Sequence, residues 1–310
     1  MRVLAKETNL LVDLPLLDES EATPLLAACE NGNLAIVQLL MQLNANIHHR
    51  ETDTGRSALL LACVEDHYSI VEYLLQSMTN EVLYNDFSKQ HESAVSTACE
   101  NGSENSLELL LARVSSPEGI DWINKKEYRG RTPLFSACAY KHLKVVQKLL
   151  KSKANPNRTD DKGVTPLFIS VQNGDASISE ELLKAKADPN TAREEDGIAP
   201  LHLVSLLGHS EELLLCLIHN NSSINQQSKF GETSLLVACQ ENRISIAQKL
   251  LELNADANIP LDDGTSPLLD ACEASNIELI KLLLAHSADI NQTRTCDNVN
   301  PKQFIDNLVL

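Results

Sequence analysis

The sequence predicts an all-α solenoid of about eight stacked repeats, each with two short helices, a turn and a hairpin, and a partial ninth repeat at the C-terminus. Three observations predict this fold. A short motif recurs every 33–39 residues, ten of the eleven glycines occupy two positions of one template, and an apolar stripe recurs after each break. Two short helices cannot enclose a core alone, so neighbouring repeats must stack.

The first helix of each repeat begins at a tetrapeptide. TPLF occurs at Thr132–Phe135 and again at Thr165–Phe168. A hydroxyl side chain can cap the free N–H groups of a helix, and proline in the first turn loses no hydrogen bond. The motif therefore predicts a first helix of about eight residues. The repeats start at Thr23, Ser57, Ser93, Thr132, Thr165, Ala199, Thr233 and Ser266.

Glycines indicate where the first helix ends and where the hairpin turns. Four glycines lie nine residues after a start, where a helix needs a left-handed closing residue. Asp66, Lys141, Asn242 and Ser275 occupy this position in the other repeats, and asparagine is the best substitute among them. Six glycines lie two residues before a start, as a tight turn requires. The two sets are Gly32, Gly102, Gly174 and Gly208, and Gly55, Gly130, Gly163, Gly197, Gly231 and Gly264.

A second helix follows each break. In segments such as Ala35–Leu40 and Ser245–Leu250, apolar residues fall at i, i+1, i+4 and i+5. This spacing places them along one face of an α-helix. Polar tails such as Ala255–Asn258 then close the repeats.

The whole pattern resembles the ankyrin repeat, whose signature is Gly-x-Thr-Pro-Leu-His-x-Ala with an Asp-x-Asn hairpin. The resemblance covers residues 21–310, and residues 1–20 are expected to form an N-terminal flank. Only Ala199–His202 keeps the histidine of the signature. His91 replaces a turn glycine, so the third repeat is expected to be the least regular, and an insertion is expected around 115–119. The ninth repeat, from Asn300, either caps the stack or indicates a fragment of a longer protein.

Six of the eight cysteines share one template position, six residues after a start. Val171 and Ser205 occupy it in the two remaining repeats, so this position favours a small side chain in a tight interior. Stacked repeats would hold these sulfurs too far apart for disulfides. Unpaired buried thiols predict a reducing compartment, the cytoplasm or alternatively the nucleus.

The net charge of −17 argues against nucleic acid or an anionic membrane as the main partner. No apolar run is long enough to cross a membrane. Catalytic and phosphate-binding motifs are absent from the sequence, and the His48–His49 pair lies in a polar tail that faces solvent. We therefore expect no enzyme activity, no cofactor, no metal site and no small-molecule substrate.

The resemblance implies a function in protein binding. Ankyrin repeats typically hold partners at the hairpin tips and at the exposed ends of the first helices. We therefore expect a non-catalytic scaffold or adaptor that binds proteins along its concave groove. The alternative is a regulatory or targeting module of a larger protein whose effector domain is missing from this chain.

Two groups of residues are the candidate binding sites. Residues 125–162 contain eleven basic residues and three acids, a local charge of +8. Trp122 either packs over the insertion or contacts a partner, while Lys144, Lys148 and Lys151 are expected to be a solvated outer face. Arginine and aromatic side chains are the usual anchors of interfaces, and exposed apolar groups often mark binding surfaces. The candidates are Trp122, Tyr128, Arg129, Arg131, Tyr140 and Lys162, and in a second, apolar patch Ile198, Leu206, Leu207 and Phe230.

Overall fold

A computed structural model of the chain describes residues 12–14, 22–79, 82–83, 86–113 and 122–306. The chain divides into two compact units, an N-terminal unit (Met1–Asp161) and a C-terminal unit (Lys162–Leu310). The described residues form α-helices, one short 3-10 helix and isolated β-bridges, without any β-strand. The all-α prediction is confirmed. The predicted insertion at 115–119, most of the flank 1–20 and residues 307–310 lie outside the described residues.

The first helices begin where the tetrapeptides predict. Seven of them have a Ser or Thr whose hydroxyl oxygen accepts the N–H of the residue three positions later, at 3.0–3.4 Å. These hydrogen bonds satisfy N–H groups that have no partner within the helix. The first helices are α2 (Pro24–Glu30), α4 (Ala58–Val64), α7 (Ala94–Asn101), α10 (Pro133–Ala139), α12 (Pro166–Gln172), α14 (Pro200–Leu207), α16 (Ser234–Gln240) and α18 (Pro267–Glu273).

The start at Ala199 lacks a hydroxyl and uses histidine instead. The Nδ1 atom of His202 accepts the backbone N–H of Ala199 at 3.1 Å, and its Nε2 atom lies 3.0 Å from the carbonyl oxygen of Glu232. His202 is fully buried, and this burial lowers its pKa. The histidine of the signature thus joins its own helix start to the hairpin of the next repeat.

The second helices run beside the first and bury their apolar stripe. In the α-helix Leu143–Lys151, for example, Val145, Val146 and Leu149 are almost fully buried. The second helices are α3 (Leu34–Gln42), α5 (Tyr68–Ser77), α8 (Glu104–Arg113), α11 (Leu143–Lys151), α13 (Ala176–Lys184), α15 (Glu211–His219), α17 (Ile244–Glu252) and α19 (Ile277–Ala285).

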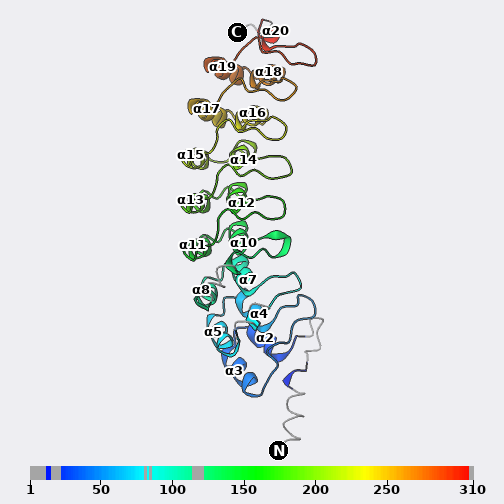
Figure 1. Ribbon diagram of the computed structural model, residues 1–310, viewed down its shortest axis with the longest axis vertical. Coiled ribbons are helices and arrows are strands. Elements are labelled where there is room, and N and C mark those ends of the chain that lie inside the picture. Colours follow the sequence, from blue (N-terminus) through cyan, green and yellow to red (C-terminus); the bar gives the residue numbers. More distant parts are fainter. Residues whose placement is uncertain (1–11, 15–21, 80–81, 84–85, 114–121, 307–310) are drawn as a thin grey trace, which may run out of the picture. The chain divides into compact units, whose positions relative to one another are not determined.

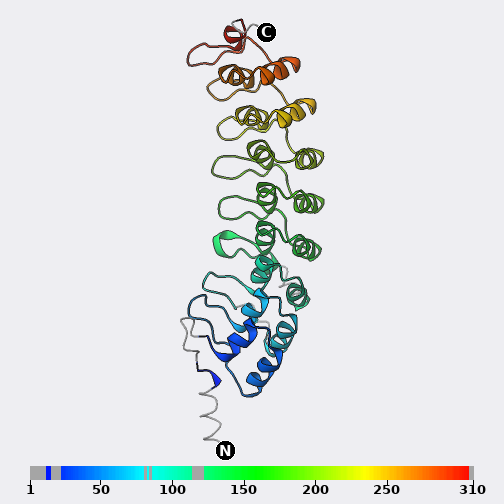
Figure 2. The same cartoon turned by 180° about the vertical axis from the view of Figure 1, so that it is seen from behind.

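Within each unit, helices pack on their counterparts in the neighbouring repeats. In the N-terminal unit α2 packs on α4, α4 on α7 and α7 on α10, while α3, α5, α8 and α11 form a parallel row. In the C-terminal unit the same holds for α12, α14, α16 and α18 and for α13, α15, α17 and α19. The hairpins project from the first-helix row on the side away from the second helices (Figures 1 and 2). The ninth repeat contributes α20 (Pro301–Ile305), which packs on α18.

The break after the first helix is left-handed in every repeat that lacks glycine there. Asp66, Lys141, Asn242 and Ser275 have φ of 52–63°, and the four glycines have φ of 69–73°. His91 has a φ of 57° in place of a turn glycine. The first helix and the hairpin turn of the third repeat therefore adopt the conformation of the template, although residues such as His91 differ from it. The fold determines the backbone conformation here, and glycine is only its least strained solution.

Backbone hydrogen bonds join successive hairpins. In five of the six hairpins with a turn glycine, the carbonyl oxygen of the residue before that glycine accepts an N–H from the next hairpin at 2.8–3.1 Å. In the N-terminal unit the pairs are Thr54 with Lys89 and Arg129 with Asp161; in the C-terminal unit they are Lys162 with Glu194, Asp196 with Lys229 and Asp263 with Thr295. Neighbouring tips in a unit are therefore held at a fixed spacing.

The cysteines are free thiols, and all six at the template position are buried. Burial raises the pKa of Cys29 and of Cys239 to about 12, so these thiols stay protonated and unreactive at neutral pH. Cys216 is half-buried and Cys296 is exposed. The predicted role of the template cysteines as small core residues agrees with this burial. Among the described residues, no helix combines the length and the apolarity that crossing a membrane requires.

Candidate protein-binding surfaces

The N-terminal unit carries a basic surface at its hairpin tips. Lys125, Lys126, Tyr128 and Arg129 are all exposed and belong to the hairpin before α10. With Phe87 and His91 of the preceding hairpin they line a pocket of about 430 Å³, together with Glu127. We call Phe87, His91, Lys125, Lys126, Tyr128 and Arg129 the basic hairpin surface.

The hairpin turn that presents this surface has an unusual backbone. The N–H of Glu127 donates to the carbonyl oxygen of Arg131 at 2.8 Å, and the N–H of Gly130 donates back to Glu127 at 2.9 Å. Between them Arg129 and Gly130 have φ of 58° and 71°, two left-handed residues in succession. Thr54, Lys162, Asp196, Phe230 and Asp263, which also precede a turn glycine, do not have a positive φ.

The cations of this hairpin lie over aromatic rings. Lys125 Nζ is 4.5 Å from the centre of the Phe87 ring, and the Arg129 guanidinium is 4.9 Å from that of Tyr128. Such contacts orient a cation and leave its charge available. None of Lys125, Lys126, Arg129 and Arg131 forms an ion pair with a carboxylate that the structure describes.

The lysines of α11 differ from those of the hairpin. Lys148 Nζ lies 2.6 Å from Glu108 and 3.1 Å from the carbonyl oxygen of Glu104, and Lys144 lies 3.5 Å from the Glu104 carboxylate. These lysines therefore join α11 to α8, in addition to forming the solvated outer face that the sequence predicts.

An acidic cleft adjoins the basic hairpin surface at Tyr128. It is lined by Glu92, Glu100 and Glu127, with Arg131 and Ser136 beside them. Glu127 is held by the N–H of Ser93, which donates to its Oε2 atom at 3.0 Å, while its Oε1 atom has no partner among the described residues. Burial raises the pKa of both Glu100 and Glu127, and the charge of Glu92 raises that of Glu100 further.

The raised pKa values predict how stability depends on pH. As the pH rises from the ordinary glutamate value of 4.5 through the raised pKa values, the folded chain holds more protons than the unfolded chain. The free energy of unfolding is therefore expected to fall over this range. Glu100→Gln removes one of these charges, so it should flatten the slope and raise stability at neutral pH. Urea unfolding at a series of pH values measures both effects, and an unchanged slope in the variant would contradict this assignment.

The structure places the predicted residues of the N-terminal unit as follows. Tyr128 and Tyr140 are exposed by 47% and 54%, and Tyr140 lies at the C-terminal end of α10. Arg131 is half-buried, with its guanidinium 5.1 Å from the centre of the Phe135 ring. Trp122 is only 6% exposed, which favours packing within the unit over partner contact, and its role in binding stays a prediction. Phe87 and His91 also line the pocket but are not predicted from the sequence, although His91 departs from the template.

The predicted residues of the C-terminal unit lie on two kinds of element. Leu206 and Leu207 are exposed by 38% and 42% in the last turn of α14, and Phe230 is exposed by 61% at a hairpin tip. Lys162 is exposed, and Ile198 is half-buried beside its own hairpin turn. Exposed leucine at a helix end and exposed phenylalanine at a tip are apolar groups that this unit does not bury.

Comparison with known proteins identifies the repeats. A family model described as ankyrin repeats (3 copies) matches residues 4–86, 81–160 and 201–294, and a model of the single ankyrin repeat matches residues 162–193. The chain is an ankyrin repeat protein. The crystal structure of the ankyrin repeat domain of Bcl-3 superposes with a TM-score of 0.64 at 21% identity, over 70% of this chain and 98% of that one. This similarity concerns the fold alone.

Several curated proteins share part of their sequence with this ankyrin repeat chain. They include the ankyrin repeat and KH domain-containing protein mask-1 of Caenorhabditis elegans (31% identity over 47% of this chain and 5% of that protein). Ankyrin repeat protein nuc-2 of Neurospora crassa is 27% identical over 76% of this chain and 21% of its own length. Inversin of Gallus gallus is 28% identical over 46% of this chain and 12% of its own length. The matches thus span only a small part of each relative.

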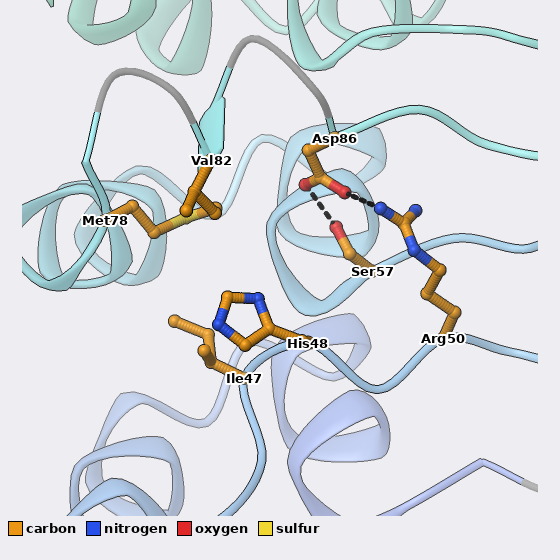
Figure 3. Close-up of a pocket in the computed structure, with 7 residues that line it drawn as sticks. All are labelled: Ile47, His48, Arg50, Ser57, Met78, Val82 and Asp86. Atoms are coloured by element: carbon orange, nitrogen blue, oxygen red, sulfur yellow. Dashed lines mark hydrogen bonds and ion pairs between the residues drawn. The ribbon is translucent and has the colours of Figure 1, made fainter.

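A half-buried ion pair connects the first two ankyrin hairpins and borders a second pocket, of about 300 Å³ (Figure 3). Asp86, only 4% exposed, accepts hydrogen bonds from the Arg50 guanidinium at 2.8 Å and from the Ser57 hydroxyl at 2.6 Å. Arg50 also donates to the carbonyl oxygens of Gly55 and Phe87 at 3.0 and 2.6 Å. Arg50, Ser57 and Asp86 are thus hydrogen-bonded to one another, and this network joins the hairpins.

Proposed function

We propose that the chain is a non-catalytic scaffold or adaptor that binds partner proteins through its hairpin tips and the ends of its first helices. The observation that carries this proposal is the exposure of Tyr128 and Tyr140, together with Arg129, which lies over the Tyr128 ring and has no ion-pair partner among the described residues. Tyrosine and arginine dominate the binding energy of many interfaces, because they bury a large area and keep a polar group for pairing.

The proposed contact residues form two surfaces, one in each unit. Tyr128, Arg129, Arg131 and Tyr140 would bind in the N-terminal unit. In the C-terminal unit we propose Lys162, Ile198, Leu206, Leu207 and Phe230. The free buried thiols favour a reducing compartment, the cytoplasm or the nucleus.

A second candidate function is that of a regulatory or targeting module within a larger protein. It is favoured by the relatives above, because the matching segment covers only 5–21% of the length of each relative. An endogenous protein heavier than 34.1 kDa in immunoblots of native lysate would support it.

Replacing the two exposed tyrosines is expected to abolish partner capture without unfolding the chain. The experiment uses the whole chain as bait in native lysate, with bound proteins quantified by mass spectrometry. Proteins retained by the wild type should be depleted at least about tenfold on Tyr128→Ser combined with Tyr140→Ser, since a central aromatic contributes about 2 kcal/mol or more. Leu207→Ser combined with Phe230→Ser tests the C-terminal surface in the same way.

The matched control is Tyr68→Ser, because Tyr68 is also exposed, by 43%, but lies at the start of the second helix α5. This control should retain every partner. Circular dichroism melting verifies that each variant is folded. The proposal would be refuted if the wild type enriched no protein, or if both pairs of variants captured as much protein as the wild type.

A further inference from the structure

We propose that the basic hairpin surface binds an acidic, extended segment of the partner protein, whose carboxylates contact Lys125, Lys126 and Arg129 and whose neighbouring apolar side chain enters the pocket beside Phe87 and Tyr128. This inference rests on the proposed function and names the chemistry of the partner at that site. Charge, pocket shape and backbone conformation each support it.

The charge of this region is opposite to that of the chain. Residues 125–161 contain ten basic residues and three acids, a balance of +7, whereas the whole chain carries −17. On α11 the basic groups Lys144 and Lys148 are paired with glutamates of α8. The three cations of the hairpin have no such pairs within the described residues, so their charge is available to a ligand. An acidic segment is the complementary partner.

The pocket selects a peptide with mixed acidic and apolar side chains. Its volume of about 430 Å³ accommodates a large side chain, and the rings of Phe87 and Tyr128 supply apolar surface. Lys125 and Arg129 lie over these two rings, so both cations are oriented before the ligand arrives. Preorganised charges lose less conformational entropy when they bind.

The conformation of Arg129 is the third argument. Among the positive-φ residues other than glycine that the structure describes, Arg129 is the one placed directly before a turn glycine. A left-handed arginine is strained, and strain at an exposed tip is a feature of functional sites. Glycine or asparagine would adopt this conformation more easily, yet the chain has an arginine there.

The acidic cleft determines where the segment can lie. Glu92 and Glu100 would repel its carboxylates on the other side of Tyr128, and Glu127, which lines both the cleft and the pocket, would keep them away from the pocket floor, where the apolar side chain lies. The segment therefore lies along the hairpin tips, over Lys125 and Arg129, and does not enter the cleft. Lys89, the remaining cation of the preceding hairpin, donates its Nζ hydrogen to the Thr52 carbonyl oxygen and is not needed for this contact.

Fluorescence anisotropy with the full chain tests the proposal. The probes are three labelled 12-residue peptides that share interspersed leucine and phenylalanine and differ only in their polar positions, which are Glu/Asp, Gln/Asn or Lys. The acidic peptide should bind, at least about tenfold more tightly than the amide peptide, and its affinity should fall as salt rises. Equal binding of the acidic and amide peptides, or binding of none, overturns the proposal. Tighter binding of a labelled single-stranded RNA 12-mer than of the acidic peptide also overturns it, because the surface would then be a nucleic-acid site.

Two charge-reversal pairs locate the site. Lys125→Glu combined with Arg129→Glu should weaken acidic-peptide binding about tenfold or more. Lys151→Glu combined with Arg158→Glu changes the net charge equally at two exposed residues of the same unit and should retain most of the affinity. An equal loss of acidic-peptide affinity in both pairs would mean that only net charge matters, and this would refute the assignment of the site to the hairpin.

Arg129→Gly separates binding from folding. Glycine relieves the left-handed strain, so the melting temperature should stay unchanged or rise while acidic-peptide affinity falls. A lower melting temperature with unchanged affinity would assign Arg129 a purely structural role. If no peptide binds but the tyrosine variants still lose proteins in lysate capture, the proposed function stands and the acidic-segment inference fails.

Discussion

Asp86→Ala is expected to lower the free energy of unfolding by about 2–3 kcal/mol. The substitution leaves the Ser57 hydroxyl, in a residue that is 4% exposed, without its acceptor, and an unsatisfied buried hydroxyl costs about 1–3 kcal/mol. It also removes the ion pair with Arg50. That loss is smaller, about 1 kcal/mol, because the Arg50 side chain is 37% exposed and keeps its hydrogen bonds to two carbonyl groups.

Urea unfolding followed by circular dichroism measures this change. Lys144→Ala is the matched control, because it removes an exposed ion pair of the same unit, with side chains that are 74% and 33% exposed. Its effect should stay within about 0.5 kcal/mol. Asp86→Asn keeps one acceptor oxygen, so its free energy of unfolding should lie between those of Asp86→Ala and Lys144→Ala. Equal midpoints for Asp86→Ala and the control would show that the network does not stabilise the hairpins.

Cys99→Leu is expected to destabilise the chain by about 1–3 kcal/mol through overpacking. Cys99 is fully buried in α7, and α7 packs between α4 and α10. A leucine adds carbon atoms to a site that has neighbouring helices on both sides. The close-packed interior can accept them only by moving the helices apart or by forcing strained rotamers.

The chain itself supplies the control for this substitution. Val171 and Ser205 occupy the same template position and are fully buried, so the site tolerates other small side chains. Cys99→Val should therefore cost less than about 1.5 kcal/mol. Comparing the urea midpoints of the two variants isolates the effect of size. If leucine were tolerated as well as valine, the small residues at this position would have no packing role.

The sequence predicts the repeats because their determinants are local. A capping hydroxyl, a proline and a glycine act within a few residues of their own helix, so the tetrapeptide at Thr132 predicts the start of α10 directly. The residues with a positive φ are predicted from their position in the repeat template. Nothing in lysine itself favours a φ of 63° at Lys141, but its template position requires it.

The candidate site is less predictable because it depends on contacts between repeats. Asp86 meets Arg50 across 36 residues of chain, and no local pattern reports that pairing. The exposure of Tyr128 and Tyr140 follows from their template positions. The burial of Trp122 does not, because it lies within the longest interval between two starts, from Ser93 to Thr132.

The repeated bonds between the residue before a turn glycine and the next hairpin join main-chain N–H and C=O groups, and every residue other than proline has both. The identity of a tip residue thus hardly affects the ladder, and a substitution there can alter what the protein recognises at little risk to its architecture. Thr54, Arg129, Lys162, Asp196 and Asp263 occupy equivalent positions in these backbone bonds with four different residue types. New specificities can therefore evolve one hairpin at a time.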